Sequence, residues 1–148
     1  VSVPRAELEV HDFAPFVALK DELMAMTCHL VFTDIDPENP ATTSRKVIEE
    51  IIRGYIGFKG LLLSDDTSMN ALKGTIGERA ANIIAGGCDI VLHCNGVMDE
   101  MQQVVRNVPA LAGASLARTK AVEAAFGKND GADEAAVRAE FDAMFAVA

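Results

Sequence analysis

The fold is decided by residues 57–69, which read Gly-Phe-Lys-Gly-Leu-Leu-Leu-Ser-Asp-Asp-Thr-Ser-Met. The run from Leu61 to Leu63 shows no alternation of apolar and polar side chains. That pattern is typical of a strand buried on both faces inside an α/β protein. Asp65 and Asp66 follow where such a strand is expected to end. Because α/β folds place their chemistry at the carboxyl ends of parallel strands, this pair is a candidate site.

Working outward from this stretch, strands and helices alternate along the chain. Apolar runs predict strands over 24–32, 59–64 and 89–94, and periodic spacing predicts helices over 7–20, 44–55, 75–86, 98–108, 115–126 and 133–145, with a turn over 129–131. Thr75 and Glu78 form a capping-box pattern, and Gly86-Gly87 marks the end of that helix. Repeated βα units predict a parallel sheet flanked by helices. A (β/α)8 barrel needs about 250 residues, so the choice is between a small open sheet and part of a barrel.

Composition limits the function classes. The chain has 148 residues, half of them hydrophobic, which predicts one domain with a proper core. The net charge of −9 argues against nucleic acid or an anionic membrane surface as a partner. No apolar run approaches the roughly 20 residues that span a bilayer. The opening residues 1–7 have no signal-peptide core, and the missing initiator Met indicates a start that is not natural.

Three cysteines, Cys28, Cys88 and Cys94, are an odd number, and they lie in or beside apolar runs. This pattern favours reduced, buried thiols that pack as small hydrophobic side chains over a disulfide framework. Reduced thiols are typical of intracellular proteins, so the sequence predicts a cytoplasmic location.

The Asp65–Asp66 pair has two interpretations. A retaining glycosidase needs an ionised carboxylate that attacks the anomeric carbon, and backbone N–H groups in a tight turn would keep such a group ionised. A run of Asp, Thr and Ser is equally what a βα loop carries to cap the following helix. The residues alone leave both interpretations open, with capping the more frequent use of such a loop.

His29 and His93 belong to two of the predicted strands and could meet Asp65 at one rim, which raises the idea of a metal. However, Cys28 and His29 are adjacent and point to opposite strand faces, and no pair of ligands has metal-site spacing. A polar residue with a hydrogen-bond partner inside a buried strand is the favoured alternative. We therefore predict no metal.

Residues 34–38 have the Asp-x-Asp-x-Glu spacing of a calcium loop, but the rest of that pattern fails. Pro37 interrupts the loop, Asn39 replaces the required Gly, and Arg45 stands where the bidentate Glu belongs. The sequence also contains neither a dinucleotide-binding nor a P-loop glycine motif, nor a nucleophile elbow. We predict no cofactor.

The chain contains several further motifs in order: residues 26–32 (Met-Thr-Cys-His-Leu-Val-Phe), 36–42 (Asp-Pro-Glu-Asn-Pro-Ala-Thr), 56–60 (Ile-Gly-Phe-Lys-Gly), 64–69 (Ser-Asp-Asp-Thr-Ser-Met) and 85–92 (Ala-Gly-Gly-Cys-Asp-Ile-Val-Leu). Together they resemble the bacterial β-N-acetylhexosaminidases of glycoside hydrolase family 3. The resemblance runs from about Leu8 to at least Phe126, and the Ser-Asp-Asp-x-x-Met element is its most specific part.

The resemblance implies a TIM-barrel enzyme that removes terminal β-linked N-acetylglucosamine with retention, which in Gram-negative bacteria happens in the cytoplasm on muropeptides during peptidoglycan recycling. It implies that residues 1–148 form one partial domain, the C-terminal portion of the barrel, with the helices of 115–148 packed outside it. The family's nucleophile maps onto Asp65. Asp66 then becomes a structural partner or cap, and no family role carries over to His29 or His93.

The chain departs from the family in one respect. The family's general acid/base lies in a Lys-His-Phe-Pro-Gly-His-Gly-Asp loop, and this sequence contains no such loop, nor the groups that grip the sugar. Proton transfer contributes typically 10²–10⁴-fold, so we expect the isolated chain hardly to turn over. Half a barrel exposes sheet edges, so we expect a companion N-terminal half or self-association. The alternative is a non-catalytic α/β module for interaction or assembly.

Overall fold

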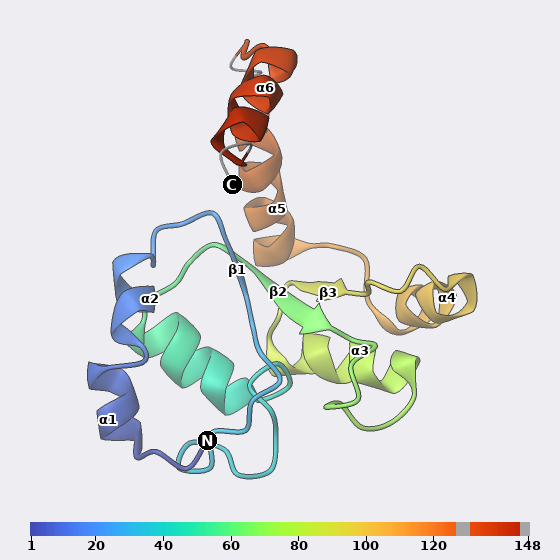
Figure 1. Cartoon of the computed structure of the whole chain (residues 1–148). Helices are drawn as coiled ribbons and strands as arrows, with labels where there is room; N and C mark the ends of the chain where they lie inside the picture. The colour runs from blue at the N-terminus through green and yellow to red at the C-terminus, as the bar shows by residue number, and fades with distance from the viewer. Residues whose placement is uncertain (127–130, 146–148) are drawn as a thin grey trace.

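A computed structural model describes residues 1–126 and 131–145 of the chain, which fold around a three-stranded parallel sheet (Figure 1). The strands are β1 (Met24–Met26), β2 (Leu61–Asp66) and β3 (Ile90–Leu92), in the spatial order β1-β2-β3. The helices are α1 (Arg5–Val10), α2 (Ala14–Ala18), η1 (Val47–Tyr55), α3 (Ile76–Gly86), α4 (Met98–Asn107), α5 (Gly113–Ala125) and α6 (Glu134–Phe145). The predicted α/β architecture with parallel βα units is confirmed.

The apolar run that decides the fold is the central strand. Leu61 and Leu62 of β2 are buried, and β2 pairs with a parallel neighbour on each side. Leu62 belongs to the main core, whose most deeply buried members also include Leu8, Ile35, Ile48, Ile51 and Ile83. Each of these side chains contributes about 1.5–3 kcal/mol through burial, so the core rests on residues drawn from the whole first two thirds of the chain.

The helix after β2 begins and ends as its sequence predicts. Thr75 Oγ1 accepts a hydrogen bond from the Glu78 N–H, and the Glu78 carboxylate accepts one from the Thr75 N–H at 2.8 Å. Gly87 ends α3 with φ of 113°, a left-handed conformation that favours glycine. Backbone groups at both ends of α3 that lack a partner within the helix therefore find one in neighbouring residues.

The predicted helix over 44–55 is a π-helix, η1, which starts at Val47. The Ser44 hydroxyl accepts a hydrogen bond from the Val47 N–H at 3.1 Å and so caps its first turn. Gly54 lies inside the helix rather than ending it, and the chain turns away at Gly57, where φ is 77°. The sequence periodicity detected the helical face, but it does not separate an i→i+5 helix from an i→i+4 one.

Several predicted boundaries are wrong. The strand over 24–32 ends at Met26, because the Cys28 carbonyl beyond it accepts hydrogen bonds from the N–H and hydroxyl of Thr42 instead of from a strand. The helix over 7–20 is two short helices, and Pro15 stands in the first turn of the second. The strand over 59–64 is displaced to 61–66, so both aspartates are its last residues rather than its sequel. The third predicted strand, 89–94, is shortened to 90–92.

Of the last two helices, α5 contacts the sheet and α6 lies away from it (Figure 1). Arg118 of α5 donates to the Lys59 carbonyl at 3.1 Å, which places α5 at the amino ends of the strands. Figure 1 shows α6 beyond α5 and away from the sheet, and the described residues of α6 are exposed. Packing of 115–148 outside a barrel, within a single partial domain 1–148, stays a prediction. The first two residues of the predicted turn over 129–131 lie outside the described residues.

A buried carboxylate ties α5 and η1 to the sheet. The Asp89 side chain is 3% exposed and accepts hydrogen bonds from Arg53 Nη2 (2.9 Å), Arg118 Nη1 (2.7 Å), Ser115 Oγ (2.6 Å) and the Leu62 N–H (2.9 Å). Burial acts to raise the pKa of the Asp89 carboxyl, but the Ser115, Leu62 and Arg118 donors lower it further than burial raises it. The net pKa lies below the ordinary value, and Asp89 stays ionised.

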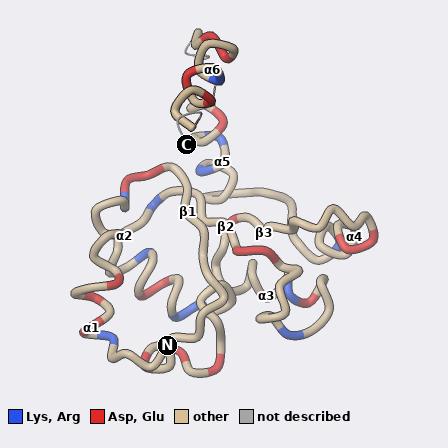
Figure 2. The backbone as a smooth tube through the Cα atoms, in the orientation of Figure 1, with Lys and Arg blue, Asp and Glu red and all other residues tan. Residues whose placement is uncertain are grey.

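Charge is spread over the molecule. Figure 2 shows acidic residues along the helices and at the end of β2. Among the helices that the structure describes, none combines the length and the apolar character needed to cross a bilayer.

Candidate functional site

The carboxyl end of β2 carries one extra residue relative to β3. Leu63 lies opposite Ile90, but Asp66 lies opposite Leu92, so the register shifts within Ser64–Asp65. The Leu92 N–H donates to the Ser64 hydroxyl at 2.9 Å, and Ser64 is fully buried. A side chain thus replaces the backbone acceptor at the irregularity. Such bulges commonly re-aim side chains beside active sites, and this one lies directly at the aspartate pair.

Asp66 connects the loops that follow β2 and β3. One of its carboxylate oxygens, Oδ1, accepts from the Ser68 N–H (3.1 Å) and from the Cys94 N–H beyond β3 (3.1 Å). The other, Oδ2, accepts from the Ser68 hydroxyl. Burial acts to raise the pKa of the Asp66 carboxyl, but the donors at Ser68 and Cys94, with the nearby His93, bring it below its ordinary value. Asp66 thus closes the turn after β2 and caps no helix, because the next helix, α3, is capped by Thr75.

Asp65 is partly buried and far less engaged. Within the described part of the chain, the hydrogen bond found for its carboxylate comes from the N–H of its neighbour Asp66, at 2.8 Å to Oδ1. One oxygen is thereby oriented, and the carboxylate keeps acceptor capacity for another molecule. Of the two aspartates, Asp65 is therefore the one whose carboxylate has fewer hydrogen bonds to the loop.

His29 spans the ends of two strands. Its Nδ1 lies 2.9 Å from Thr42 Oγ1, and its Nε2 lies 2.9 Å from the backbone oxygen of Asp66. Thr42 is fully buried and also contacts Thr27 Oγ1 at 2.9 Å. His29 has partners in the protein, as the favoured alternative expects, but it is partly exposed and lies three residues beyond the end of β1 rather than inside a buried strand.

His93 lies on the other side of the site, with a side chain only 6% exposed. Its Nε2 faces Glu100 Oε2 of α4 at 3.2 Å, and its Nδ1 lies 3.4 Å from Thr67 Oγ1. His93 Nε2 and Glu100 Oε2 lie within ion-pair distance, but neither atom has a hydrogen-bond partner among the described residues. Both ring nitrogens of His29 face protein atoms, and His93 is buried with its Nε2 toward Glu100, so neither histidine is placed as a free proton donor beside Asp65.

The other candidate residues do not join the site. Asp36 binds its own loop through Ser44 Oγ (2.6 Å) and Asn39 Nδ2 (3.1 Å), as an ordinary loop carboxylate does. Among the described residues, no group of three potential ligands could hold a metal ion. The prediction of three buried thiols is wrong for two cysteines: Cys88 is buried, but Cys28 is partly exposed and Cys94, in the loop after β3, is exposed.

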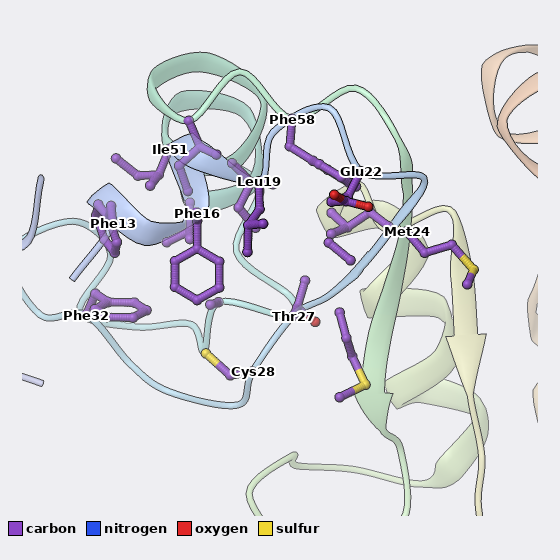
Figure 3. A pocket seen from close by; sticks show the side chains of 17 residues that line it. Phe13, Phe16, Leu19, Glu22, Met24, Thr27, Cys28, Phe32, Ile51 and Phe58 are labelled. Atoms are coloured by element: carbon purple, nitrogen blue, oxygen red, sulfur yellow. The ribbon is translucent and has the colours of Figure 1, made fainter. Parts of the chain in front are cut away.

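A second feature lies at the open edge of the sheet, away from Asp65. An open cavity of about 330 Å³ lies between α2, β1 and η1. Figure 3 shows aromatic side chains, including Phe13, Phe16 and Phe32, around it, with Met24 on its β1 side. We call this cavity the edge groove. Its lining is almost wholly apolar, so it suits protein side chains rather than a sugar.

The profile of the glycosyl hydrolase family 3 N-terminal domain matches residues 1–124. The chain belongs to glycosyl hydrolase family 3. Its parallel βα units are accordingly part of a TIM-barrel-type α/β fold, as the sequence predicts.

Individual relatives of family 3 agree. A beta-hexosaminidase of Neisseria meningitidis serogroup C is 42% identical over 115 residues, which cover 72% of this chain and 32% of that protein. NagZ of Neisseria gonorrhoeae, solved in complex with N-trifluoroacetyl-D-glucosamine, superposes with a TM-score of 0.68 at 34% identity, covering 81% of this chain and 34% of that one. A β-N-acetylglucosaminidase of Thermotoga maritima gives a TM-score of 0.67 at 29% identity, covering 86% and 31%. The chain thus spans about a third of the length of these relatives.

The sequence did not indicate several residues that hold the loops at the carboxyl ends of the strands. Ser64 and Thr42 are fully buried hydroxyls whose partners lie far along the chain. Arg79 of α3 holds the loop after β2 by donating to the carbonyls of Thr67 (2.9 Å) and Met69 (3.1 Å). The one available signal was a polar residue inside an apolar run, as at Ser64.

Proposed function

We propose that this chain supplies the nucleophile portion of a retaining β-N-acetylhexosaminidase. The observation that carries the proposal is the contrast within the aspartate pair at the carboxyl end of β2. Both carboxylate oxygens of Asp66 accept hydrogen bonds from the surrounding loops. The Asp65 carboxylate accepts one N–H and keeps acceptor capacity for a substrate. Family membership and relatives named as beta-hexosaminidases support the same activity.

The reaction would proceed in two displacements. The Asp65 carboxylate attacks the anomeric carbon of a terminal β-linked N-acetylglucosaminyl unit, and the glycosidic C–O bond breaks as the leaving oxygen takes a proton from a general acid. Water then attacks the glycosyl ester, loses a proton to the same group acting as base, and releases the sugar with its configuration retained. The carboxylate is regenerated, so no cofactor is consumed.

The general acid has to come from other polypeptide. His29 contacts Thr42 and Asp66, and His93 faces Glu100 within the protein. His11 is exposed at the C-terminal end of α1, far from β2 in the sequence. A carboxylate nucleophile without an acid loses typically 10²–10⁴-fold of the rate. We therefore expect little release of an aryl alcohol by the isolated chain.

The partner in this proposal is the remainder of a barrel. β1 is an edge strand with unpaired backbone groups, and Met24 and Met26 are 46% and 59% exposed. The edge groove continues that strand as an apolar surface that a preceding parallel strand and its helix would cover. Relatives more than twice as long as this chain contain enough polypeptide to do so.

The biological setting proposed is peptidoglycan recycling in the cytoplasm, with N-acetylglucosaminyl muropeptides as substrates. It rests on the family resemblance and on cysteines that are free in the structure, as expected of reduced thiols. A muropeptide digest analysed by mass spectrometry before and after addition of the assembled protein tests it. Loss of terminal N-acetylglucosamine from intact muropeptides is the expected result.

The activity itself is tested with an aryl N-acetyl-β-glucosaminide, using this chain alone and then with the polypeptide that completes the barrel. We expect release only from the combination, and a fall of about 10³-fold or more for Asp65→Asn. Asp12→Asn, an exposed aspartate between α1 and α2, is the matched control and should leave the rate unchanged. Equal rates for Asp65→Asn and the control would refute the nucleophile assignment.

The edge groove also supports a second candidate, a non-catalytic α/β module that uses this surface for assembly. In that case Met26→Lys, which places a charge on the exposed edge, would abolish assembly, while Asp65→Asn would alter nothing measurable. Light scattering after gel filtration measures the molar mass and separates the outcomes. Self-association doubles the mass of the chain on its own, whereas barrel completion raises the mass only when the partner polypeptide is added.

A further inference from the structure

The peptide that follows the aspartate pair is held from both sides of β2. The N–H of Thr67 donates to the Leu92 carbonyl of β3 at 2.9 Å, while the carbonyl of Asp66 faces His29 Nε2 at 2.9 Å. One peptide unit is therefore anchored to β3 by its nitrogen and to the segment after β1 by its oxygen. The Asp66 N–H, which donates to Asp65, belongs to the preceding peptide unit and is joined to this one through the Asp66 Cα, so the anchor restricts its position. The Asp66 carbonyl also accepts from the Met69 N–H at 3.2 Å, within the same loop.

The proton on His29 follows from the partners. A backbone carbonyl only accepts hydrogen bonds, so His29 Nε2 at 2.9 Å from the Asp66 oxygen must carry a hydrogen. On the other side of the ring, Nδ1 lies 2.9 Å from the Thr42 hydroxyl, whose own hydrogen goes to the Cys28 carbonyl, so this hydroxyl faces Nδ1 as an acceptor. The hydrogen on Nε2 is therefore assigned from the Asp66 carbonyl alone.

Buried hydroxyl groups fix the orientation of the His29 ring. Thr42 is fully buried and Thr27 is 5% exposed, and the two hydroxyls are 2.9 Å apart. Thr42 also donates to the Cys28 carbonyl at 2.8 Å, so it is fixed to the segment after β1 that carries the histidine. A ring held by such a buried partner cannot rotate freely, and its Nε2–H is directed at one acceptor.

We propose that His29 is a positioning residue for Asp65, an inference that rests on the proposed function. It does not touch the substrate. By fixing the Asp66 carbonyl, it holds the backbone that presents the Asp65 carboxylate. Displacement of a reacting group by about 1 Å can cost on the order of 10²-fold in rate, so losing this anchor should lower kcat more than it changes KM.

Two amide variants separate the two nitrogens. The side-chain amide of Gln in His29→Gln reaches about as far as Nε2 and can donate to the Asp66 carbonyl, whereas that of Asn in His29→Asn reaches about as far as Nδ1 and serves only Thr42. Measured on the chain combined with the polypeptide that completes the barrel, His29→Gln should retain kcat within a few-fold, and His29→Asn and His29→Ala should lose about 10- to 100-fold with KM little changed. His11→Gln on the surface is the matched control. Equal kcat for the Gln and Asn variants, at equal melting temperature, would overturn the proposal.

Spectroscopy keeps the inference testable if the proposed activity fails. In long-range ¹H–¹⁵N correlation spectra of the folded chain, His29 Nε2 should carry a hydrogen. The ¹³C resonance of the Asp65 carboxyl should shift in His29→Asn but not in His29→Gln or His11→Gln. A bare Nε2, or an Asp65 signal unaffected by all three, would refute the positioning role. Absence of Asp65-dependent turnover with these signals intact would refute only the proposed function.

Discussion

Removal of the Asp89 carboxylate should be among the most damaging changes to this fold. Asp89 is 3% exposed and accepts four hydrogen bonds, two of them from Arg53 and Arg118. At about 1 kcal/mol each, a modest value for an ionised acceptor because the two arginines are partly solvated, these bonds amount to about 4 kcal/mol. Breaking one side of a buried ion pair costs about 3–5 kcal/mol, which agrees. For a chain of this size, Asp89→Ala should lower the melting temperature by about 10 °C.

Urea unfolding followed by circular dichroism measures the effect. Glu49→Gln is the control, because its pair with Arg45 is also a carboxylate–arginine contact but both side chains are more than half exposed, so it should cost at most about 0.5 kcal/mol. An Asp89→Ala loss within about 1 kcal/mol of that control would refute the assignment of Asp89 as an anchor of α5 and η1.

The same carboxylate predicts a pH dependence. Because the folded pKa of Asp89 is depressed, its ionised form stabilises the native state above the unfolded pKa of about 3.9, and that stabilisation is lost as pH falls through the lower folded pKa. The difference in unfolding free energy between the wild type and Asp89→Ala should be constant from about pH 5 to 8 and shrink below about pH 4. A difference that grew on acidification would contradict this reasoning.

Three smaller predictions concern the frame of the site. Thr75→Ala removes the cap of α3 and should cost about 1 kcal/mol in urea unfolding, with Thr33→Ala on the surface near zero. Gly86→Ala places a methyl group 2.9 Å from the Thr43 backbone, so it should cost about 1–3 kcal/mol or prevent folding, seen as loss of the cooperative transition. Burial raises the pKa of the Cys88 thiol to about 12, so an aromatic disulfide reagent at pH 8 should label Cys94 in the native chain and Cys88 only after unfolding; early labelling of Cys88 would count against its burial.

Local patterns in the sequence predicted the parts of the fold that local chemistry controls. Leu61–Leu63 needs only its own composition to be recognised as a buried strand, and Thr75 with Glu78 completes a cap within one helical turn. The position of the aspartate pair at the end of that strand followed from the same reasoning. These features depend on neighbours a few residues away, which a sequence displays directly.

Features that depend on distant partners could not be predicted. β1 ends early because the side chain of Thr42, fourteen residues from Cys28, takes its carbonyl. The register shift before Asp66 depends on a hydroxyl at Ser64 meeting the Leu92 N–H across the sheet. The distinction between Asp65 and Asp66 depends in part on the Cys94 N–H, which reaches Asp66 from the loop after β3. Residue types alone do not show which residues far apart in the sequence form these hydrogen bonds.

The extra residue in β2 makes chain length, and not only side-chain identity, a requirement of this motif. Side chains of a strand alternate between faces, so deleting or inserting one residue between Gly60 and Asp65 would exchange the surroundings of the two neighbouring acids. The wrong acid would then be presented, although every functional group was still encoded. In library design or gap placement at this segment, an indel should therefore be treated as more severe than most substitutions.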